Sequence, residues 1–126
     1  MNKTNAEGRA DTKHLEGRIV ETTYYGKLIP ELVDQVRRDV EAELRKIGGG
    51  DWLCDVSLVE GFKAAPSGAA NTFFSSFRAA GGRRIAVAVA SSPVRMVGSA
   101  LAFAVGQDIK WFANREDALR HLRSSS

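Results

Sequence analysis

The sequence predicts a single α/β domain built on a mainly parallel sheet of four to five strands, with helices packed on its faces. Segments rich in β-branched and aromatic residues alternate with segments of helical apolar spacing, an order typical of strand–helix–strand units. The run 85–90 (IAVAVA) is continuously apolar, as expected for a strand covered by helices on both faces. The chain has 126 residues, the length of one domain, and neither an internal repeat nor a long linker divides it.

The first half of the chain predicts an arm, a strand, a helix and a second strand. Residues 1–16 are polar and lack apolar periodicity, so we expect a flexible N-terminal arm. Residues 18–25 (RIVETTYY) predict a strand, and we expect it to lie at an exposed edge of the sheet. Pro30 then begins a helix of regular apolar spacing that the glycines at 48–50 end. Residues 52–62 alternate in polarity and predict the next strand.

The helix that begins at Pro30 has two distinct faces. Its apolar positions follow helical spacing and are expected to face the core: Leu32, Val33, Val36, Val40, Leu44 and Ile47. The opposite face carries charged residues that we expect in solvent: Asp34, Arg37, Arg38, Glu41 and Arg45.

The second half of the chain continues the alternation. Pro66 and Ser67 begin a helix before the apolar strand at 85–90, and a third helix is expected over 94–105. Residues 109–112 predict a short strand. Asn114 followed by Asp117 resembles a capping box, which predicts a last helix running to Arg123.

Few residues are suited to catalysis or metal binding. Cys54 lies within an alternating strand, where a buried and unreactive thiol is expected, and a single cysteine excludes an internal disulfide. His14 lies in the N-terminal arm and His121 in the last helix, so neither is an evident partner for a nucleophile. Asp55 and Glu60, five positions apart on a strand, point to opposite faces. We therefore predict a protein that is not an enzyme and that uses no metal or cofactor.

Charge is distributed unevenly along the chain. Residues 1–60 contain 9 Lys/Arg and 12 Asp/Glu, whereas residues 61–126 contain 9 Lys/Arg and 3 Asp/Glu. Between Gly61 and Gln107 there is no carboxylate. Such an asymmetry can orient a partner or a second copy, although charges that decorate solvated faces explain it equally well. The cations are too widely spread for a nucleic-acid-binding stripe, so no nucleic acid is expected.

One loop, residues 59–69, leads from the carboxyl end of a strand into the N-terminus of a helix. A helix N-terminus carries partial positive charge and unpaired amides, which attract an anion or a partner bearing carboxylates. The expected partner-binding residues are Lys63, Ser67, Gly68, Asn71 and Arg95. Ser67 has an alternative interpretation as a plain helix N-cap.

The segment order from about residue 17 to 122 resembles the STAS domain, the fold of anti-sigma-factor antagonists and sulfate-transporter tails. The stretches that carry the resemblance are 52–59 (WLCDVSLV), 66–68 (PSG), 85–95 (IAVAVASSPVR) and 112–119 (FANREDAL). It implies a STAS-like domain over residues 17–123 and a tail at 124–126. It also implies a regulatory, bacterial and cytoplasmic module that binds a protein partner without being an enzyme.

The expected loop departs from that family in one respect. The family has an Asp-Ser-Ser/Thr-Gly loop whose serine a kinase phosphorylates, and matching Gly68 to its glycine places Ala65 on the Asp and Pro66 on that serine. Ser67 is the one remaining hydroxyl, and we favour its role as a helix cap over that of a phosphosite.

A STAS-like branch that also lacks the phosphosite, similar to the CRAL-TRIO fold, leaves an alternative function of small-ligand or lipid binding. The reason for this alternative is the apolar content of residues 73–77 and 98–105, although aromatic residues at helical spacing normally fill a core. The expected partners are therefore an unidentified protein, a second copy joined through the edge at 18–25, or a ligand. No membrane span is expected, because the longest apolar stretch, 94–105, contains Arg95.

Overall fold

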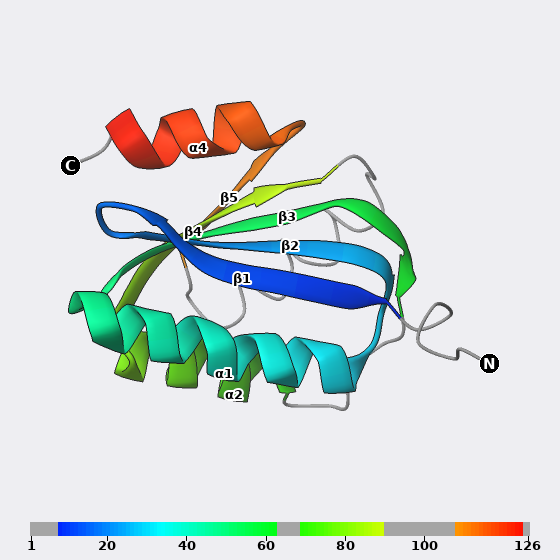
Figure 1. Cartoon of the computed structure of the whole chain (residues 1–126), viewed down its shortest axis with the longest axis horizontal. Coiled ribbons are helices and arrows are strands. Elements are labelled where there is room, and N and C mark those ends of the chain that lie inside the picture. Colours follow the sequence, from blue (N-terminus) through cyan, green and yellow to red (C-terminus); the bar gives the residue numbers. More distant parts are fainter. Residues whose placement is uncertain (1–7, 63–68, 90–107, 125–126) are drawn as a thin grey trace.

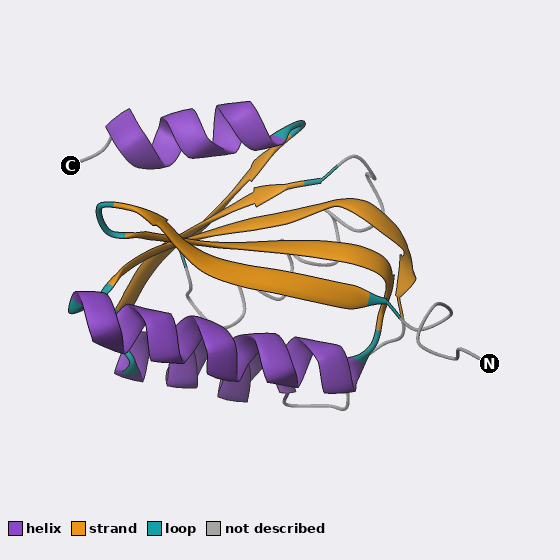
Figure 2. Cartoon of the chain, in the orientation of Figure 1, coloured by secondary structure: helices purple, strands orange, loops and turns teal. Residues whose placement is uncertain are grey.

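A computed structural model describes residues 8–62, 69–89 and 108–124, and for residues 61, 62, 69 and 70 it describes the backbone alone. These residues form five strands and three helices (Figures 1 and 2). The strands are β1 (Arg9–Glu16), β2 (Ile19–Leu28), β3 (Gly50–Phe62), β4 (Gly82–Ala88) and β5 (Ile109–Phe112). The helices are α1 (Pro30–Ile47), α2 (Ala69–Ala79) and α4 (Arg115–Ser124).

The five strands form one sheet in the order β1-β2-β3-β4-β5. Strand β1 pairs with β2 antiparallel, and the other three neighbouring pairs are parallel. Parallel neighbours require a crossover, and α1 and α2 supply two of these connections. The predicted α/β domain with a mainly parallel sheet is confirmed.

The expectation of a flexible arm over residues 1–16 was wrong for residues 9–16, which form β1. A turn at Gly17, whose φ is 48°, folds this segment back on β2, so that Arg9 lies opposite Tyr25 and Lys13 opposite Glu21. Among the described strands β1 lies at the edge of the sheet, where charged residues are common. Its pairing with β2 supplies hydrogen bonds to one side of the segment. Consequently β2 is an interior strand, and the expectation of an exposed edge at 18–25 was also wrong.

Helix α1 has the predicted limits. Proline occupies its first turn, where a missing N–H costs nothing, and Gly48 ends it with φ 78° and ψ 26° in the left-handed region. The Gly49 amide donates to the Leu44 carbonyl at 2.8 Å and so satisfies a terminal acceptor.

The remaining described elements also match their predictions to within a few residues. Strand β3 begins two residues earlier than expected, and β5 spans residues 109–112 as predicted. At the start of α4 the Asn114 Oδ1 atom accepts a hydrogen bond from the Asp117 amide at 2.9 Å, which confirms the predicted cap. The expected helix at 94–105 lies outside the described residues.

The core has two layers, one on each side of the sheet (Figure 1). Because successive strand residues point to opposite faces, Val20 faces α1 and α2 whereas Ile19 faces α4. The α1/α2 layer contains the larger side chains, among them Trp52 and Phe77. Alanines of β4 leave room for α4 on the other side.

Candidate functional site: the exposed face of helix α2

The expected partner-binding residues are only partly described. Lys63, Ser67, Gly68 and Arg95 lie outside the described residues. Asn71 lies in the first turn of α2 and is exposed. Helix α2 follows the carboxyl end of β3 in the chain, as the sequence predicted, and its described first turn contains no acidic residue.

Aromatic packing determines which face of α2 is exposed. Phe77 is fully buried, and its ring centroid lies 6.1 Å from that of Trp52. Phe73 stacks on Trp52 at 5.6 Å, and Phe74 meets Phe73 edge to face at 5.4 Å. These rings contribute to the core on the α1/α2 side of the sheet. The outward face of α2 therefore carries small and polar residues: Asn71, Thr72, Ser75, Arg78 and Ala79.

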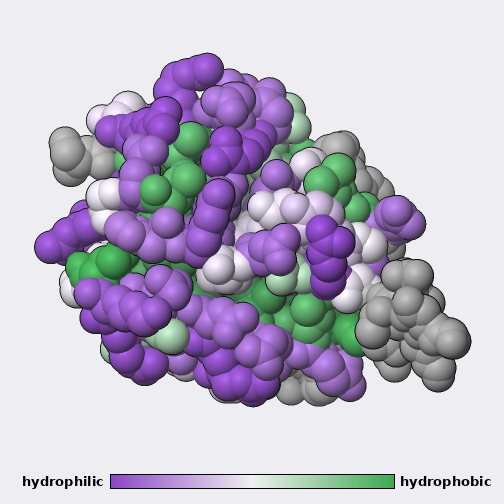
Figure 3. All heavy atoms as spheres, viewed as in Figure 1, coloured by the Kyte–Doolittle hydropathy of each residue, from purple (hydrophilic) through white to green (hydrophobic). Residues whose placement is uncertain are grey.

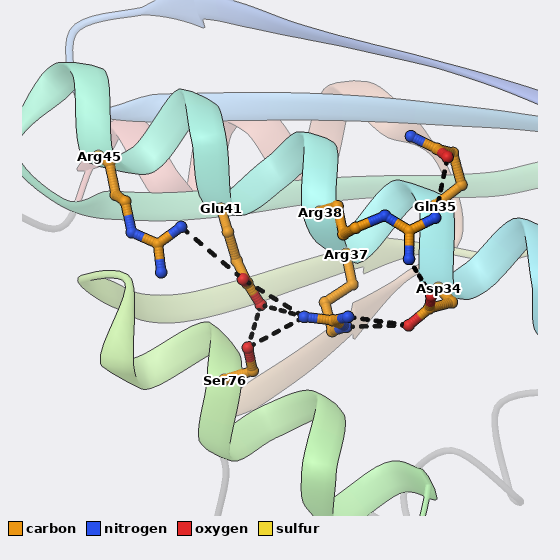
Figure 4. Close-up of polar contacts among 7 residues, drawn as sticks. All are labelled: Asp34, Gln35, Arg37, Arg38, Glu41, Arg45 and Ser76. Atoms are coloured by element: carbon orange, nitrogen blue, oxygen red, sulfur yellow. Dashed lines mark hydrogen bonds and ion pairs between the residues drawn. The ribbon is translucent and has the colours of Figure 1, made fainter.

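A polar contact attaches α2 to α1 (Figure 4). The carboxylate of Glu41, on α1, accepts hydrogen bonds from the Ser76 hydroxyl of α2 and from the Arg37 guanidinium at 3.2 Å. Arg37 also donates to Ser76 Oγ at 3.1 Å, so the three side chains form a closed triangle. Arg45 lies 3.9 Å from the same carboxylate.

The charged face of α1 differs from the expected solvated surface. Glu41 is buried, with only 7% of its side chain exposed, because α2 lies over it. Asp34 bonds Arg37 at 2.9 Å and also pairs with Arg38 (Figure 4). The hydrogen bond to Asp34 is the main cause of the raised pKa of Arg37, and the same bond lowers the pKa of Asp34. Asp34 and Arg38 remain at the surface, as predicted.

Sequence reasoning did not find the Glu41–Ser76 contact. Glu41 directly follows the buried Val40 and so lies beside the apolar stripe, which was the available signal. Nothing in the local sequence indicates that a serine 35 positions later meets it.

Ion pairs join the acidic first half of the chain to its basic second half. Arg84 Nη2 lies 2.6 Å from Asp51 Oδ2, and Arg123 Nη2 lies 2.6 Å from Glu16 Oε1. Arg115 binds the buried Glu21, with a second contact at 3.2 Å. Part of the charge asymmetry is thus neutralised within the chain, which reduces the charge left for steering a partner.

The polar groups considered for catalysis have structural contacts. Cys54 is buried, as predicted, and burial raises the pKa of its thiol. Asp55 accepts hydrogen bonds from the amide and the hydroxyl of Ser57 at 3.0 and 2.5 Å. His14 bonds the Gly17 carbonyl at 2.8 Å, and the His121 ring packs on Phe112.

The described residues also bear on metal binding and on membrane insertion. Among residues 8–62, 69–89 and 108–124, no group of three His, Cys, Asp or Glu side chains is arranged to hold a metal ion. Over the same ranges, none of the helices combines the length and apolar character needed to cross a membrane.

Comparison of the whole fold with solved structures gives close architectural matches. The anti-sigma factor antagonist SpoIIAA in its unphosphorylated form matches with a TM-score of 0.65 and 16% identity, over 91% of this chain and 98% of that one. A DUF3478-family protein with a SpoIIAA-like fold from Shewanella loihica matches with a TM-score of 0.62 and 17% identity, over 92% and 94%. An anti-sigma factor antagonist from Mycobacterium paratuberculosis matches with a TM-score of 0.59 and 11% identity, over 94% and 97%.

No protein-family model matches the chain, and no curated protein matches it significantly. At these identities the structural matches concern the fold, and they agree with the strand order and helix placement described above. The chain therefore has the STAS-like fold of SpoIIAA.

Proposed function

We propose that this chain is a non-enzymatic regulatory module that binds a protein partner through the loop before α2 and the N-terminal turn of that helix. The observation that carries the proposal is the match of nearly the whole chain to two anti-sigma factor antagonists. The proposed contact residues are Lys63, Ser67, Gly68, Asn71 and Arg95.

Two features of α2 support this surface. The first turn of α2 holds no acidic residue, so its partial positive charge is not offset by a side chain of that turn. The core packing of Phe77 and the contact of Ser76 with Glu41 hold the helix against α1 and the sheet, so its outward face is presented rigidly. A partner with carboxylates at its contact surface would complement the positive charge of this turn, and the fixed position of the helix would keep that charge in place for binding.

In the proposed mode of binding Ser67 acts as a helix cap and not as a phosphorylation switch. Pro66 occupies the position that carries the phosphorylated serine in the family loop, and a proline there removes a backbone donor. Ser67→Ala should then cost about 1 kcal/mol of stability and leave partner binding intact, because the hydroxyl of a capping serine bonds the helix and not the partner. Phosphoserine at this position in protein from the native host, or loss of binding in Ser67→Asp, would show instead that the switch is retained.

Affinity capture from the native host, followed by quantitative mass spectrometry, tests the binding surface. The bait proteins are the wild type, the charge reversals Lys63→Glu and Arg95→Glu, and Asn71→Asp. Arg120→Glu is the matched control, because Arg120 is exposed on α4 at the opposite side of the sheet (Figure 1). A partner should be retained by wild type and control and depleted by the three other variants. Full retention by all three would show that the surface is wrong.

The alternative function, lipid or small-ligand binding, requires an apolar cavity near α2. The described aromatic residues of this helix instead contact Trp52 and one another, as core residues do. Native mass spectrometry of the purified protein discriminates the two functions. A co-purified lipid would favour the alternative, and an unliganded mass favours the protein-binding module.

A further inference from the structure

Strand β1 forms one edge of the sheet described here and lies at the front of Figure 1. One side of the strand pairs with β2, and the other has no neighbour among the described strands. Its residues Asp11, Lys13 and His14 are exposed. Figure 3 shows this side of the molecule, with strongly hydrophilic residues over α1 and α4 and a mixture of polar and hydrophobic residues between them.

Backbone geometry limits how two copies of β1 can pair antiparallel about a twofold axis. In an extended strand alternate residues direct their N–H and C=O groups to the same side, so every second residue of β1 offers both groups outward. Residues that exchange hydrogen bonds across the pair must both belong to this set. The twofold axis must therefore pass through a residue of β1 and not between two residues.

Charge then disfavours the two registers on either side of the one centred on Thr12. A pair centred on Ala10 places Arg9 opposite Asp11, but it includes only residues 9–11 of β1. Centring the pair on Asp11 places Asp11 against its own copy and Arg9 against Lys13, so both contacts are repulsive. Centring it on Lys13 places two lysines together. Centring it on Thr12 places Asp11 opposite Lys13 twice, with Ala10 opposite His14. Charged residues on an edge strand usually prevent pairing, and here they do so in the two registers adjacent to Thr12.

The Thr12-centred register also avoids the part of β1 where its pairing with β2 is irregular. The pairing of β1 with β2 is regular from Arg9 to His14 and shifts between His14 and Glu16. The residues needed for this register, 10–14, all lie within the regular part. Asp11 and Lys13 are two positions apart and so lie on the same face of the sheet, where side chains directly opposite each other are in contact distance.

We propose that β1 is a self-association edge that pairs antiparallel with β1 of a second copy, centred on Thr12, and joins the two sheets. The occupant is a second copy, because the twofold rotation places Asp11 of each copy opposite Lys13 of the other and so makes the edge complementary to itself. A single strand pair buries less surface than a stable dimer interface, so the dimer is weak and forms with rising protein concentration. This inference goes beyond the proposed function, which uses α2, and does not depend on it.

Sedimentation equilibrium over a concentration series tests the proposal with four proteins: wild type, Asp11→Lys, Lys13→Asp and the double reversal. Each single reversal should weaken association about tenfold, because two cross-strand pairs become repulsive together. The double reversal should restore association, since it exchanges the charges and retains their complementarity. Arg120→Glu is the matched control and should associate as the wild type does.

A second measurement does not depend on how the variants fold. An equal mixture of isotope-labelled and unlabelled wild-type protein should show intermolecular NOE contacts between the two copies of Thr12. A wild-type protein that stays monomeric at all concentrations would overturn the proposal that β1 pairs with a second copy. A double reversal as weak as the single reversals, in a protein that unfolds at the wild-type temperature, would overturn the register. Equal weakening by Arg120→Glu would overturn the assignment to β1.

Discussion

Replacing Asp51 by alanine removes the acceptor at the centre of a buried ion pair. Asp51 lies at the start of β3, and its carboxylate accepts hydrogen bonds from the Arg84 amide at 3.0 Å, from Arg84 Nε at 3.2 Å and from Arg84 Nη2 at 2.6 Å. The Asp51 side chain is 6% exposed and that of Arg84 16%. The bond to Asp51 is the main cause of the raised pKa of Arg84. Without that bond the guanidinium still stays charged, because the ordinary pKa of arginine lies far above neutral pH.

The expected cost follows from what Asp51→Ala leaves behind. Arg84 retains a bond to the Leu122 carbonyl at 3.2 Å, but its charge and its backbone amide lose the carboxylate in a mostly buried place. Removing one partner of a buried ion pair costs about 3 kcal/mol of unfolding free energy. For a domain of 126 residues this lowers the melting temperature by roughly 10 °C.

Urea unfolding followed by tryptophan fluorescence provides the assay, because Trp52 is buried next to Asp51 in the chain. A double-mutant cycle with Arg84→Ala separates the ion pair from other effects. If the loss of the Asp51–Arg84 pair causes the destabilisation, the double variant is less destabilised than the sum of the two single variants. Arg120→Ala removes an exposed ion pair as the control and should cost less than about 1 kcal/mol.

Two results would refute this reasoning. A loss below about 1 kcal/mol in Asp51→Ala would mean that solvent or a rearranged partner compensates the charge. Additivity of the two single variants to within about 0.5 kcal/mol would mean that the pair contributes no coupling.

Two further predictions concern titrating groups. Because burial raises the pKa of Cys54, its thiol should resist alkylation in the folded protein at pH 8 and react only after unfolding; rapid labelling under native conditions would contradict its burial. The hydrogen bond from Arg123 lowers the pKa of Glu16 below its ordinary value of 4.5. This contact therefore stabilises the fold above the ordinary value and ceases to do so as the pH falls through the lowered one. In an NMR titration Arg123→Gln should raise the pKa of Glu16, and an unchanged value would exclude the contact in solution.

The parts of the fold that the sequence determined by itself depend on residues close together in the chain. Helix α1 has its proline start, its apolar spacing and its Gly48 cap within residues 30–48. The cap of α4 involves Asn114 and Asp117, three positions apart. The apolar run of β4 indicates a strand covered on both faces. These signals can be recognised in the sequence because the residues that produce each one lie within a single helix, a single helix cap or a single strand.

The candidate site was predictable to a similar extent. The place of α2 after β3 and the exposure of Asn71 follow from the strand-then-helix order and the apolar spacing of the helix, whereas the binding role of this region stays a prediction. The attachment of α2 to α1 through Glu41 and Ser76 did not follow, because it joins residues 35 positions apart.

Tertiary structure alone decided the features in which distant segments meet. The polar β1 segment is a strand because β2 pairs with it, and its own residues do not favour one. Gly49 and Gly81 approach so closely that a Cβ on Gly49 would lie 2.9 Å from the Gly81 carbonyl oxygen, a requirement that neither local sequence reveals. The acidic and basic halves hold each other through pairs such as Asp51 with Arg84. A side chain's local sequence specifies its polarity and conformational preference, but its burial and its partners depend on which segment the fold places against it.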